Sequence, residues 1–388
     1  MCFVYFLYID IIMLRNSRSN KGGCDVSGRI TMQDIADALG LSRNTVSKAI
    51  NNTGVIAEST KDLILKKAVE MGYINPAGVN NVAAGVLRYG MSPALPGKKE
   101  IAMLTSSMPS GSHFAVTTLD RMQQIFSAQG YSVAYYQITH EELSELRLPG
   151  NLDLDKIAAL FCIELFDHDY CNMLVSLGVP LLLIDGPVRP DKGPLAVDTL
   201  IMENFTGIHA FVRELAAQGK KSVGFVGNIN HCRSFFERGN ACIAAAAVNG
   251  LPPAEEYSIL SFPPGPPNSD AKKPTTYANF TNALFELLQK LPALPEVFIC
   301  ANDFIAIHLI DSLRRMNIRC PEDILVMGFD DSPESRFHTP PLSTVHIHTQ
   351  SMGRLAAELI LSRIVDPSRE PRDTYSHTDL ILRESSRF

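Results

Sequence analysis

Hydrophobic residues follow two different periods along this chain. Between residues 31 and 71, apolar positions recur every three or four residues in short runs, the first of which ends at Gly40. That spacing is typical of amphipathic helices. From residue 100 onward, short continuous apolar runs alternate with longer segments of helical period. The second pattern predicts buried strands connected by helices.

The predicted strands and helices alternate over residues 100–331. Strands are predicted at 100–107, 130–138, 157–163, 179–186, 222–227, 257–262, 296–303 and 323–331. Helices are predicted at 114–129, 168–177, 204–218, 236–249, 277–290 and 304–316. Apolar strands alternating with amphipathic helices imply a parallel sheet that is covered on both faces. Because there are too many strands for one compact sheet, we predict an α/β domain of two doubly wound lobes, with a ligand site beyond the carboxyl ends of the strands.

The N-terminal pattern predicts three helices. Ile35, Ala36 and Leu39 lie on one face of the first helix, and Gly40 follows as a left-handed turn residue. Ser42 is then placed to cap a second helix, and a third helix continues to about residue 71. Two short helices joined by a tight glycine turn and braced by a third form a helix-turn-helix, whose second helix enters the DNA major groove.

The second helix carries side chains that are suited to DNA. Arg43 and Lys48 can donate to guanine O6 and N7, and Asn44 can make paired bonds to adenine. Hydroxyl and amide groups beside them can bond phosphates and fix the register. The candidate DNA-binding residues are therefore Thr31, Ser42, Arg43, Asn44, Thr45, Ser47, Lys48 and Asn51. A merely solvated helix face is the alternative, because residues 29–75 hold six basic and five acidic residues.

Composition indicates a globular protein with more than one domain. The 388 residues are 46% hydrophobic and 20% charged, with a net charge of −6, so any contact with nucleic acid must be local. The eight cysteines contain no C-x-x-C pair, which favours reduced thiols and predicts no metal site. The apolar run near the N-terminus is too short to span a membrane. Because the sequence contains no P-loop, no G-x-S-x-G and no carboxylate pair with a supporting base, no catalytic site and no cofactor are predicted.

The N-terminal helix-turn-helix, called here the head, resembles that of a known family. From Thr31 to Asn51 the sequence matches every fixed position of T-x-x-D-I-A-x-x-x-G-x-S-x-x-T-V-S-x-x-x-N, the signature of the lac repressor/gal repressor family of bacterial transcription factors. The blocks "CANDFIAIHLIDSL", "GFDDSP" and "LILRESS" extend the resemblance almost to residue 388. The resemblance implies a cytoplasmic repressor with a periplasmic-binding-protein-like effector domain. It also implies a homodimer that reads a pseudo-palindromic operator and responds to a small-molecule effector.

The resemblance further implies a hinge helix whose leucine enters the minor groove. Asn81, Ala84 and Leu87 match that helix, but Gly85 stands where the family has arginine, and a flexible linker is the alternative. Leu87 therefore joins the DNA-binding candidates. The expected divisions are a non-native or disordered extension (1–28), the helix-turn-helix (29–75), the hinge or linker (76–99) and the effector-binding and dimerisation domain (100–388).

The resemblance also carries over a set of effector-binding residues: Ser106, Phe114, Arg238, Asn302 and Asp330. Arginine and aspartate make charge-assisted hydrogen bonds and an aromatic ring covers an apolar face, which suits a sugar or a purine. Asn302 could instead cap the helix at 304–316, and Asp330 could be a turn residue. The family's compact D-N-x-x-G is interpreted as spread over Asp198 and Asn204-x-x-Gly207.

Three functions from different classes fit parts of this pattern. A ligand-responsive repressor explains both the head and the body, with a sugar as the expected effector and a purine corepressor as the alternative. A solute-binding protein for transport would explain the body alone and would need an export signal. An enzyme lacks a catalytic constellation, since His346 and His348 alternate on one strand-like face and are interpreted as structural or solvent-facing.

Overall fold

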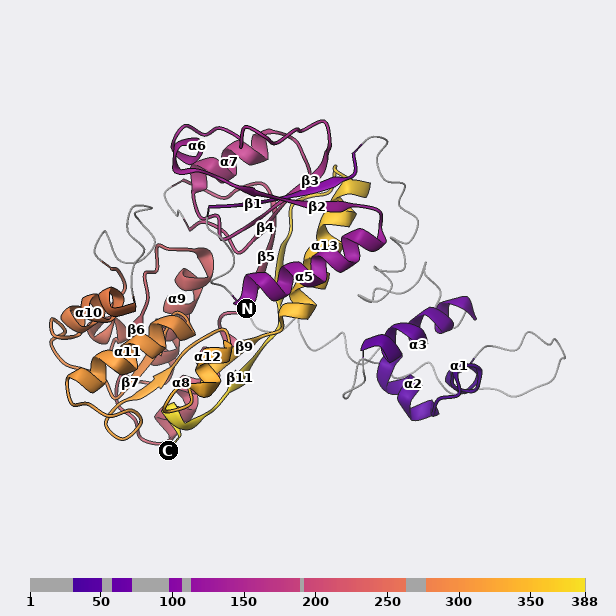
Figure 1. Ribbon diagram of the computed structural model, residues 1–388. Coiled ribbons are helices and arrows are strands. Elements are labelled where there is room, and N and C mark those ends of the chain that lie inside the picture. The colour runs from indigo at the N-terminus through magenta and orange to yellow at the C-terminus, as the bar shows by residue number, and fades with distance from the viewer. Residues whose placement is uncertain are drawn as a thin grey trace, which may run out of the picture. The chain divides into compact units, whose positions relative to one another are not determined.

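The computed structural model describes residues 31–50, 58–71, 98–106, 113–188, 192–262 and 277–387. The chain divides into two compact units, Met1–Arg88 and Tyr89–Phe388 (Figure 1). The expectations for the extension at 1–28 and for the hinge with Asn81, Ala84, Gly85 and Leu87 lie outside the described residues, as does Asn51. Within the part of the chain that is described, no helix is long and apolar enough to cross a membrane.

The first unit contains the three helices of the predicted helix-turn-helix. They are α1 (Met32–Leu39), α2 (Arg43–Ile50) and α3 (Glu58–Glu70). Gly40 ends α1 with a φ of 65°, and its amide donates to carbonyls in the last turn of the helix. That left-handed conformation is easily adopted by glycine, which explains the sharp turn into α2. The three helices share one small core of Ile35, Ala36, Val46, Ala49, Ile64 and Ala68.

The second unit begins with a lobe built on a six-stranded parallel sheet, called here the first lobe. Its strands are β1 (Glu100–Thr105), β2 (Ser132–Gln137), β3 (Ile157–Ile163), β4 (Leu181–Ile184), β5 (Asp198–Met202) and β10 (Asp373–Ser376). They lie in the order β10-β5-β4-β3-β1-β2. Side chains of β3, β4 and β5 are buried along their whole length, as expected for a sheet covered on both faces.

Four helices belong to the first lobe: α5 (His113–Ala128), α6 (His140–Ser144), α7 (His168–Ser176) and α13 (Thr349–Val365). α5 and α13 lie side by side (Figure 1). Their backbones approach closely at Gly353, where a Cβ atom would come within 2.6 Å of the Thr118 carbonyl oxygen. A side chain at this position would therefore separate the two helices.

The second lobe has a three-stranded parallel sheet in the order β6-β7-β8. Its strands are β6 (Val223–Val226), β7 (Val297–Cys300) and β8 (Leu325–Met327). Its helices are α8 (Thr206–Ala217), α9 (Arg233–Val248), α10 (Tyr277–Leu288), α11 (Asp303–Arg315) and α12 (Pro333–Phe337), with 3-10 turns at Ala254–Tyr257 and Glu384–Ser386. An antiparallel pair, β9 (Thr344–Ile347) and β11 (Thr378–Ile381), borders this lobe.

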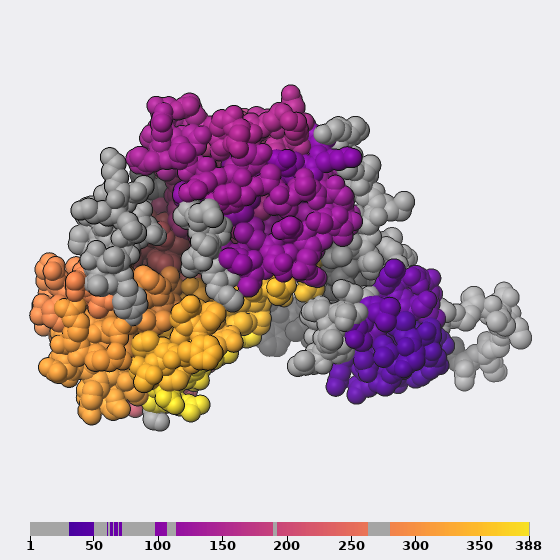
Figure 2. Space-filling model, in the orientation of Figure 1, coloured from indigo at the N-terminus to yellow at the C-terminus, as the bar shows by residue number. Residues whose placement is uncertain are grey.

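The chain passes between the lobes at three places. β5 leads into α8, β9 leads into α13, and β10 leads into β11. Each lobe is built from separated parts of the sequence, and the two lobes belong to one compact unit. The space-filling surface is hollowed between the first lobe, in magenta, and the orange part of the second (Figure 2).

The predicted two-lobed α/β architecture is confirmed, although several local elements differ from the prediction. The strand predicted at 257–262 is wrong: the segment makes a single bridge between Ile259 and Val226 and follows a 3-10 turn. β5 was not predicted. It occupies most of the segment between Asp198 and Asn204, over which the D-N-x-x-G motif is interpreted as spread. These two residues lie near opposite ends of β5, so they do not form one site.

Candidate functional site

The described DNA-binding candidates lie along α2 and at its N-cap, except for Thr31, which precedes α1. Ser42 accepts a hydrogen bond from the Thr45 amide at 3.1 Å, and its hydroxyl lies 2.8 Å from the Thr45 hydroxyl. Ser42 is therefore the N-cap of α2, as predicted. Arg43, Asn44 and Lys48 are exposed. This exposure leaves their side chains accessible to a base edge.

Thr31 has a structural role that the sequence analysis missed. Its backbone amide donates to an Asp34 carboxylate oxygen at 2.7 Å, and the Asp34 amide donates to the Thr31 hydroxyl at 3.4 Å. This reciprocal pair is a capping box, and its Thr-x-x-Asp spacing is legible in the sequence. The hydrogen bonds from Thr31 lower the pKa of Asp34, because they stabilise the ionised carboxylate.

Arg238 is the most deeply buried of the effector-binding candidates. It lies on α9 with 2% of its surface exposed, and its guanidinium carbon is 3.5 Å from the centroid of the Phe329 ring. Its Nε donates to Asn204 Oδ1 at 2.9 Å, and its Nη1 donates to the Ala301 carbonyl at 2.6 Å. Burial lowers the pKa of Arg238, while Asp330 acts in the opposite direction. An arginine that is held this firmly presents its remaining donors in a fixed direction.

The structure brings Asp330 close to Arg238, and an effector-binding role for the two residues stays a prediction. Asp330 follows β8 with a φ of 115°, and its Oδ1 lies 3.6 Å from Arg238 Nη1. Burial raises the pKa of Asp330 to about 8; Arg238 opposes this rise, and the charges of Asp303, Glu164 and Asp185 add to it. Strained backbone and a perturbed pKa often occur together at binding sites.

Carboxylates from both lobes act electrostatically on Asp330, the partner of Arg238. Glu164 follows β3 and Asp185 follows β4 in the first lobe, while Asp303 and Asp330 follow β7 and β8 in the second. All four lie at the carboxyl ends of parallel strands, where ligands of such folds bind. This convergence places the candidate site between the lobes.

The other three candidates have different environments. Asn302 Oδ1 accepts from the Ile305 amide at 3.0 Å, so Asn302 caps α11, which was the alternative interpretation. Ser106 follows β1 and donates to the Glu164 carbonyl at 3.0 Å, which links it to the strand ends of the first lobe. Phe114 is half-buried on α5 and packs against the core. Roles for these three residues in binding remain predictions.

An aromatic group close to Arg238 was missed. The His231 ring lies 4.9 Å from Phe166 and 5.1 Å from Phe235, measured between ring centroids. Phe166 belongs to the first lobe, whereas His231 and Phe235 belong to the second, and the Phe235 centroid is 5.9 Å from the Arg238 guanidinium carbon. Burial lowers the pKa of His231 and so favours its neutral ring. Phe166 follows β3, His231 follows β6, and Phe235 lies in the first turn of α9. Nothing in the sequence indicates that the three rings lie together.

Asp185 and Glu203 act as caps. Asp185 accepts from the Ser234 amide at 3.1 Å and from the Ser234 hydroxyl at 2.5 Å, which joins the end of β4 to the start of α9. Glu203 accepts from the amides of Phe205 and Thr206 at the start of α8. Glu203 thus takes the place of aspartate in a compact E-N-x-x-G that runs through Asn204 to Gly207, and our spread reading of that motif is wrong.

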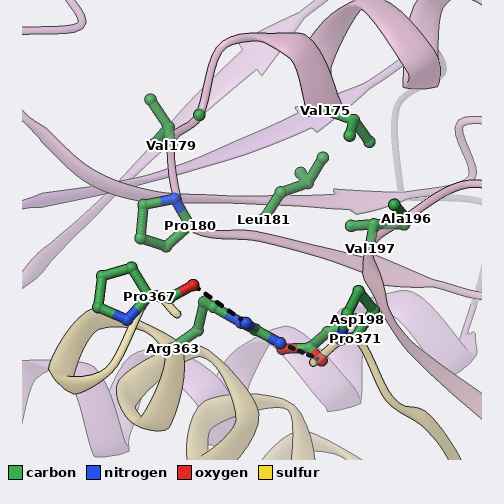
Figure 3. A pocket seen from close by; sticks show the side chains of 11 residues that line it. Val175, Val179, Pro180, Leu181, Ala196, Val197, Asp198, Arg363, Pro367 and Pro371 are labelled. Carbon is green, nitrogen blue, oxygen red and sulfur yellow. Dashed lines mark hydrogen bonds and ion pairs between the residues drawn. The ribbon is translucent and has the colours of Figure 1, made fainter. Parts of the chain in front are cut away.

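A pocket at the opposite end of the first-lobe strands is structural. It is lined by residues at the start of β4 and β5 and by Arg363 of α13 (Figure 3). Arg363 donates from Nε and Nη2 to the two carboxylate oxygens of Asp198, at 2.9 and 2.8 Å. Because this buried bidentate pair is already satisfied and lies at the amino ends of the strands, it stabilises the lobe and is not the effector site.

Comparison with known proteins agrees with both parts of the molecule. The family model for bacterial regulatory proteins of the lacI family matches residues 31–75, and that for a periplasmic binding protein-like domain matches residues 212–386. The HTH-type transcriptional repressor PurR of Haemophilus influenzae is 27% identical over 372 residues, covering 92% of this chain and 98% of the relative. The HTH-type transcriptional regulator GalR of Lacticaseibacillus casei is 27% identical over 367 residues, covering 92% and 99%.

Solved structures show the same fold. A transcriptional regulator CelR–cellobiose complex superposes with a TM-score of 0.62 at 22% identity, covering 92% of this chain and 100% of that chain. A lac repressor dimer bound to operator superposes with a TM-score of 0.59 at 19% identity, covering 92% and 99%. The chain belongs to the lacI family of bacterial regulatory proteins and is a transcriptional regulator that joins a helix-turn-helix head to a periplasmic-binding-protein-like effector domain.

Proposed function

We propose that this regulator is a repressor whose affinity for operator DNA is controlled by an uncharged sugar bound between its two lobes. The observation that carries the proposal is the charge around Arg238. This one arginine is already hydrogen-bonded to Asn204 and to the Ala301 carbonyl, and Asp330 Oδ1 lies 3.6 Å from its Nη1. Asp303, Glu164 and Asp185 add further negative charge around Asp330.

This charge distribution favours hydroxyl groups over anions. A carboxylate or phosphate placed between the lobes would add its negative charge to the charges that already raise the pKa of Asp330. A sugar hydroxyl can donate to a carboxylate and accept from a guanidinium, so it satisfies both kinds of group without adding charge. Uncharged sugars therefore suit the site better than uronic acids or sugar phosphates.

The aromatic group of Phe166, His231 and Phe235 supports a ligand with an apolar face. The C–H face of a pyranose ring packs against such side chains. A purine ring would stack on them equally well, so a purine corepressor is the second candidate. The charge argument does not separate these two candidates, since both are neutral at pH 7.

For the head, we propose that α2 reads bases through Arg43, Asn44 and Lys48, with Ser42, Thr45 and Ser47 at the phosphates. One helix-turn-helix covers half of a typical operator, so a homodimer on a pseudo-palindromic site is the expected assembly. The compartment that we propose is the cytoplasm, where operator DNA lies. The alternative function of the effector domain is that of a solute-binding protein for transport. This alternative does not explain the helix-turn-helix head.

The test combines ligand binding with DNA binding, using the full-length protein. Thermal unfolding is measured with neutral sugars (D-galactose, D-glucose, D-ribose, cellobiose), anionic ones (D-glucuronate, glucose 6-phosphate) and purines (hypoxanthine, guanine). A ligand at 100 times its dissociation constant stabilises the native state by about 2.7 kcal/mol, so a specific hit is readily seen. An operator duplex selected from a random pool then shows whether the hit changes DNA affinity.

We expect stabilisation by a neutral sugar and a changed operator affinity in its presence. Stabilisation by hypoxanthine or guanine alone would favour the second candidate. Stabilisation by D-glucuronate or glucose 6-phosphate alone would contradict the charge argument. Failure to select any duplex would count against the regulator, and would leave a solute-binding function for the second unit.

A further inference from the structure

The start of α9 is bonded to the first lobe as well as to its own. Arg233, its first residue, donates from Nη2 to Asp373 Oδ2 and to the Tyr375 hydroxyl, each at 3.0 Å. Asp373 and Tyr375 lie on β10, the edge strand of the six-stranded sheet, whereas α9 packs in the second lobe. The Arg233 amide also donates to the Gly186 carbonyl beyond β4. Arg233 therefore ties the two lobes together beside the candidate effector site.

Glu237, one turn further along α9, continues these contacts inward. Its Oε1 accepts from Arg233 Nε at 2.9 Å and from the Tyr375 hydroxyl at 2.8 Å. Its Oε2 accepts from Asn204 Nδ2 at 2.8 Å. Both carboxylate oxygens are thus used, one toward the first lobe and the other toward the interior.

Asn204 completes a connection to the effector arginine. Its Oδ1 accepts from Arg238 Nε while its Nδ2 donates to Glu237, so the two neighbours allow only one orientation of the amide. Asn204 is 1% exposed and Glu237 is 8% exposed. Leaving a buried donor or acceptor without a partner costs free energy. Breaking one of these hydrogen bonds therefore also destabilises its neighbours.

These residues form one continuous set of contacts, which we call the α9 relay: Asp373, Tyr375, Arg233, Glu237 and Asn204. We propose that the α9 relay positions Arg238 and couples effector binding there to the orientation of the first lobe. A ligand that binds Arg238 changes the strength of the Arg238–Asn204 hydrogen bond, and the change passes through Glu237 to the Arg233 contacts on β10. Effector binding at Arg238 would in this way alter the contacts on β10 although the ligand does not touch that strand.

This proposal deepens the proposed function and rests on it. The relevant quantity is the coupling factor, the ratio of sugar affinities of free and operator-bound protein, which is commonly about 5 to 150 in allosteric proteins. The probe is the panel sugar, among D-galactose, D-glucose, D-ribose and cellobiose, that gives the largest thermal shift in the wild type. Calorimetric titration of the full-length protein, with and without the selected operator duplex, yields the factor.

The outer end of the α9 relay offers mild variants. Asp373→Asn removes the charge that holds Arg233, and Tyr375→Phe removes only a hydroxyl from a side chain that is 42% exposed. Asp379→Asn is the matched control, because the Asp373 and Asp379 side chains are both 52% exposed, but Asp379 contacts His348 and His377 instead of an arginine. All three variants keep the shape of the original side chain.

We expect D373N and Y375F to lower the coupling factor at least about threefold while the DNA-free protein still binds the sugar, and D379N to match the wild type. A purely structural contact would lower the melting temperature and leave the coupling factor unchanged. Wild-type coupling in both D373N and Y375F, or an equal loss in D379N, would overturn the relay. The proposed function fails differently, because the wild type itself would then show no sugar binding or no coupling.

Discussion

Asp330 and Asp331 are adjacent in the chain, but their carboxylates serve different surroundings. Asp330 Oδ1 faces Arg238 at 3.6 Å, and its side chain is 30% exposed. Asp331, with 6% of its side chain exposed, accepts from Arg336 at 2.7 Å, from Arg383 at 2.5 Å and from His346 at 2.9 Å. The first carboxylate is therefore available to a ligand, whereas the second holds α12, β9 and the C-terminal segment together.

This division predicts opposite outcomes for two conservative variants. Asp330→Asn should weaken sugar binding at least tenfold and leave the free energy of unfolding nearly unchanged, because it removes a partner of the ligand rather than of the scaffold. Asp331→Asn should instead lower the free energy of unfolding by about 3 kcal/mol, since Arg383 and Arg336 lose the buried carboxylate that they both contact. Sugar titrations and denaturant unfolding of both variants check this. Equal effects on stability would show that the two carboxylates are not functionally divided.

Much of the fold was predictable because buried parallel strands appear in a sequence as continuous apolar runs. β3 coincides with the predicted 157–163, and α5 and α11 begin within one residue of their predicted starts. The strand predicted at 257–262 failed because the segment makes backbone hydrogen bonds beside β6 only around the buried Ile259, which gives a single bridge. The local hydrophobic pattern indicates which residues are buried. Whether a buried segment forms a strand depends on its hydrogen bonds to neighbouring strands.

The candidate site was only partly predictable. The resemblance located Arg238 and Asp330, and the structure brings them together. Neither periodicity nor motif indicated that Asn204 would connect Arg238 to Glu237, because the residues that the amide joins are more than thirty positions away from it. Asn302 was recognisable as a cap from the residues that follow it, and that simpler interpretation is the one that its hydrogen bond supports.

A buried histidine in the second lobe predicts a specific loss of stability in acid. His308 is fully buried on α11 between Phe280 and Phe304, and burial lowers its pKa to about 4. The unfolded chain takes up this proton near pH 6.5 and the native state does so only near 4, so stability is complete above 6.5 and is lost as the pH falls between these values. From pH 7.5 to 5 the loss from this group is about 2 kcal/mol.

His308→Asn provides the comparison, since its amide can still meet the Thr281 hydroxyl that lies 2.7 Å from His308 Nδ1. The variant should be less stable at pH 7.5, because the smaller side chain leaves space, but it should lose less stability on acidification. Urea unfolding of both proteins at pH 7.5 and pH 5 gives the two differences. An identical pH dependence in the wild type and H308N would refute the assignment.

The cap of α2 allows helix stability and DNA affinity to be separated. Ser42→Ala removes the hydroxyl that accepts from the Thr45 amide and should destabilise the head by about 1 kcal/mol. Ser42→Asp restores a capping oxygen, so amide hydrogen exchange in α2 should return to wild-type rates. The added negative charge should nevertheless weaken operator binding, because it lies where phosphates are expected. Wild-type operator affinity in S42D would show that the cap lies away from the DNA.

Arg43 and Lys48 are the side chains of α2 that we predict to read bases. Arg43 and Lys48 are exposed and can reach guanine, so replacing either by alanine should relax base preference at one operator position at a cost of about 1–3 kcal/mol. Lys66 on α3 is an exposed lysine of the same head and serves as the control. Its removal should lower affinity evenly, through the salt-dependent part of binding, or not at all.

Repeated selection from a random duplex pool with the wild type, R43A, K48A and K66A distinguishes these cases, because it reports preference position by position. Loss of information at one symmetric pair of positions is expected for R43A and at a different pair for K48A, since a two-fold dimer repeats each contact in both half-sites. K66A should yield the wild-type motif. If R43A and K48A also returned the wild-type motif with uniformly weaker binding, both side chains would contact phosphates, and the base-reading residues would have to be sought elsewhere on α2, beginning with Asn44.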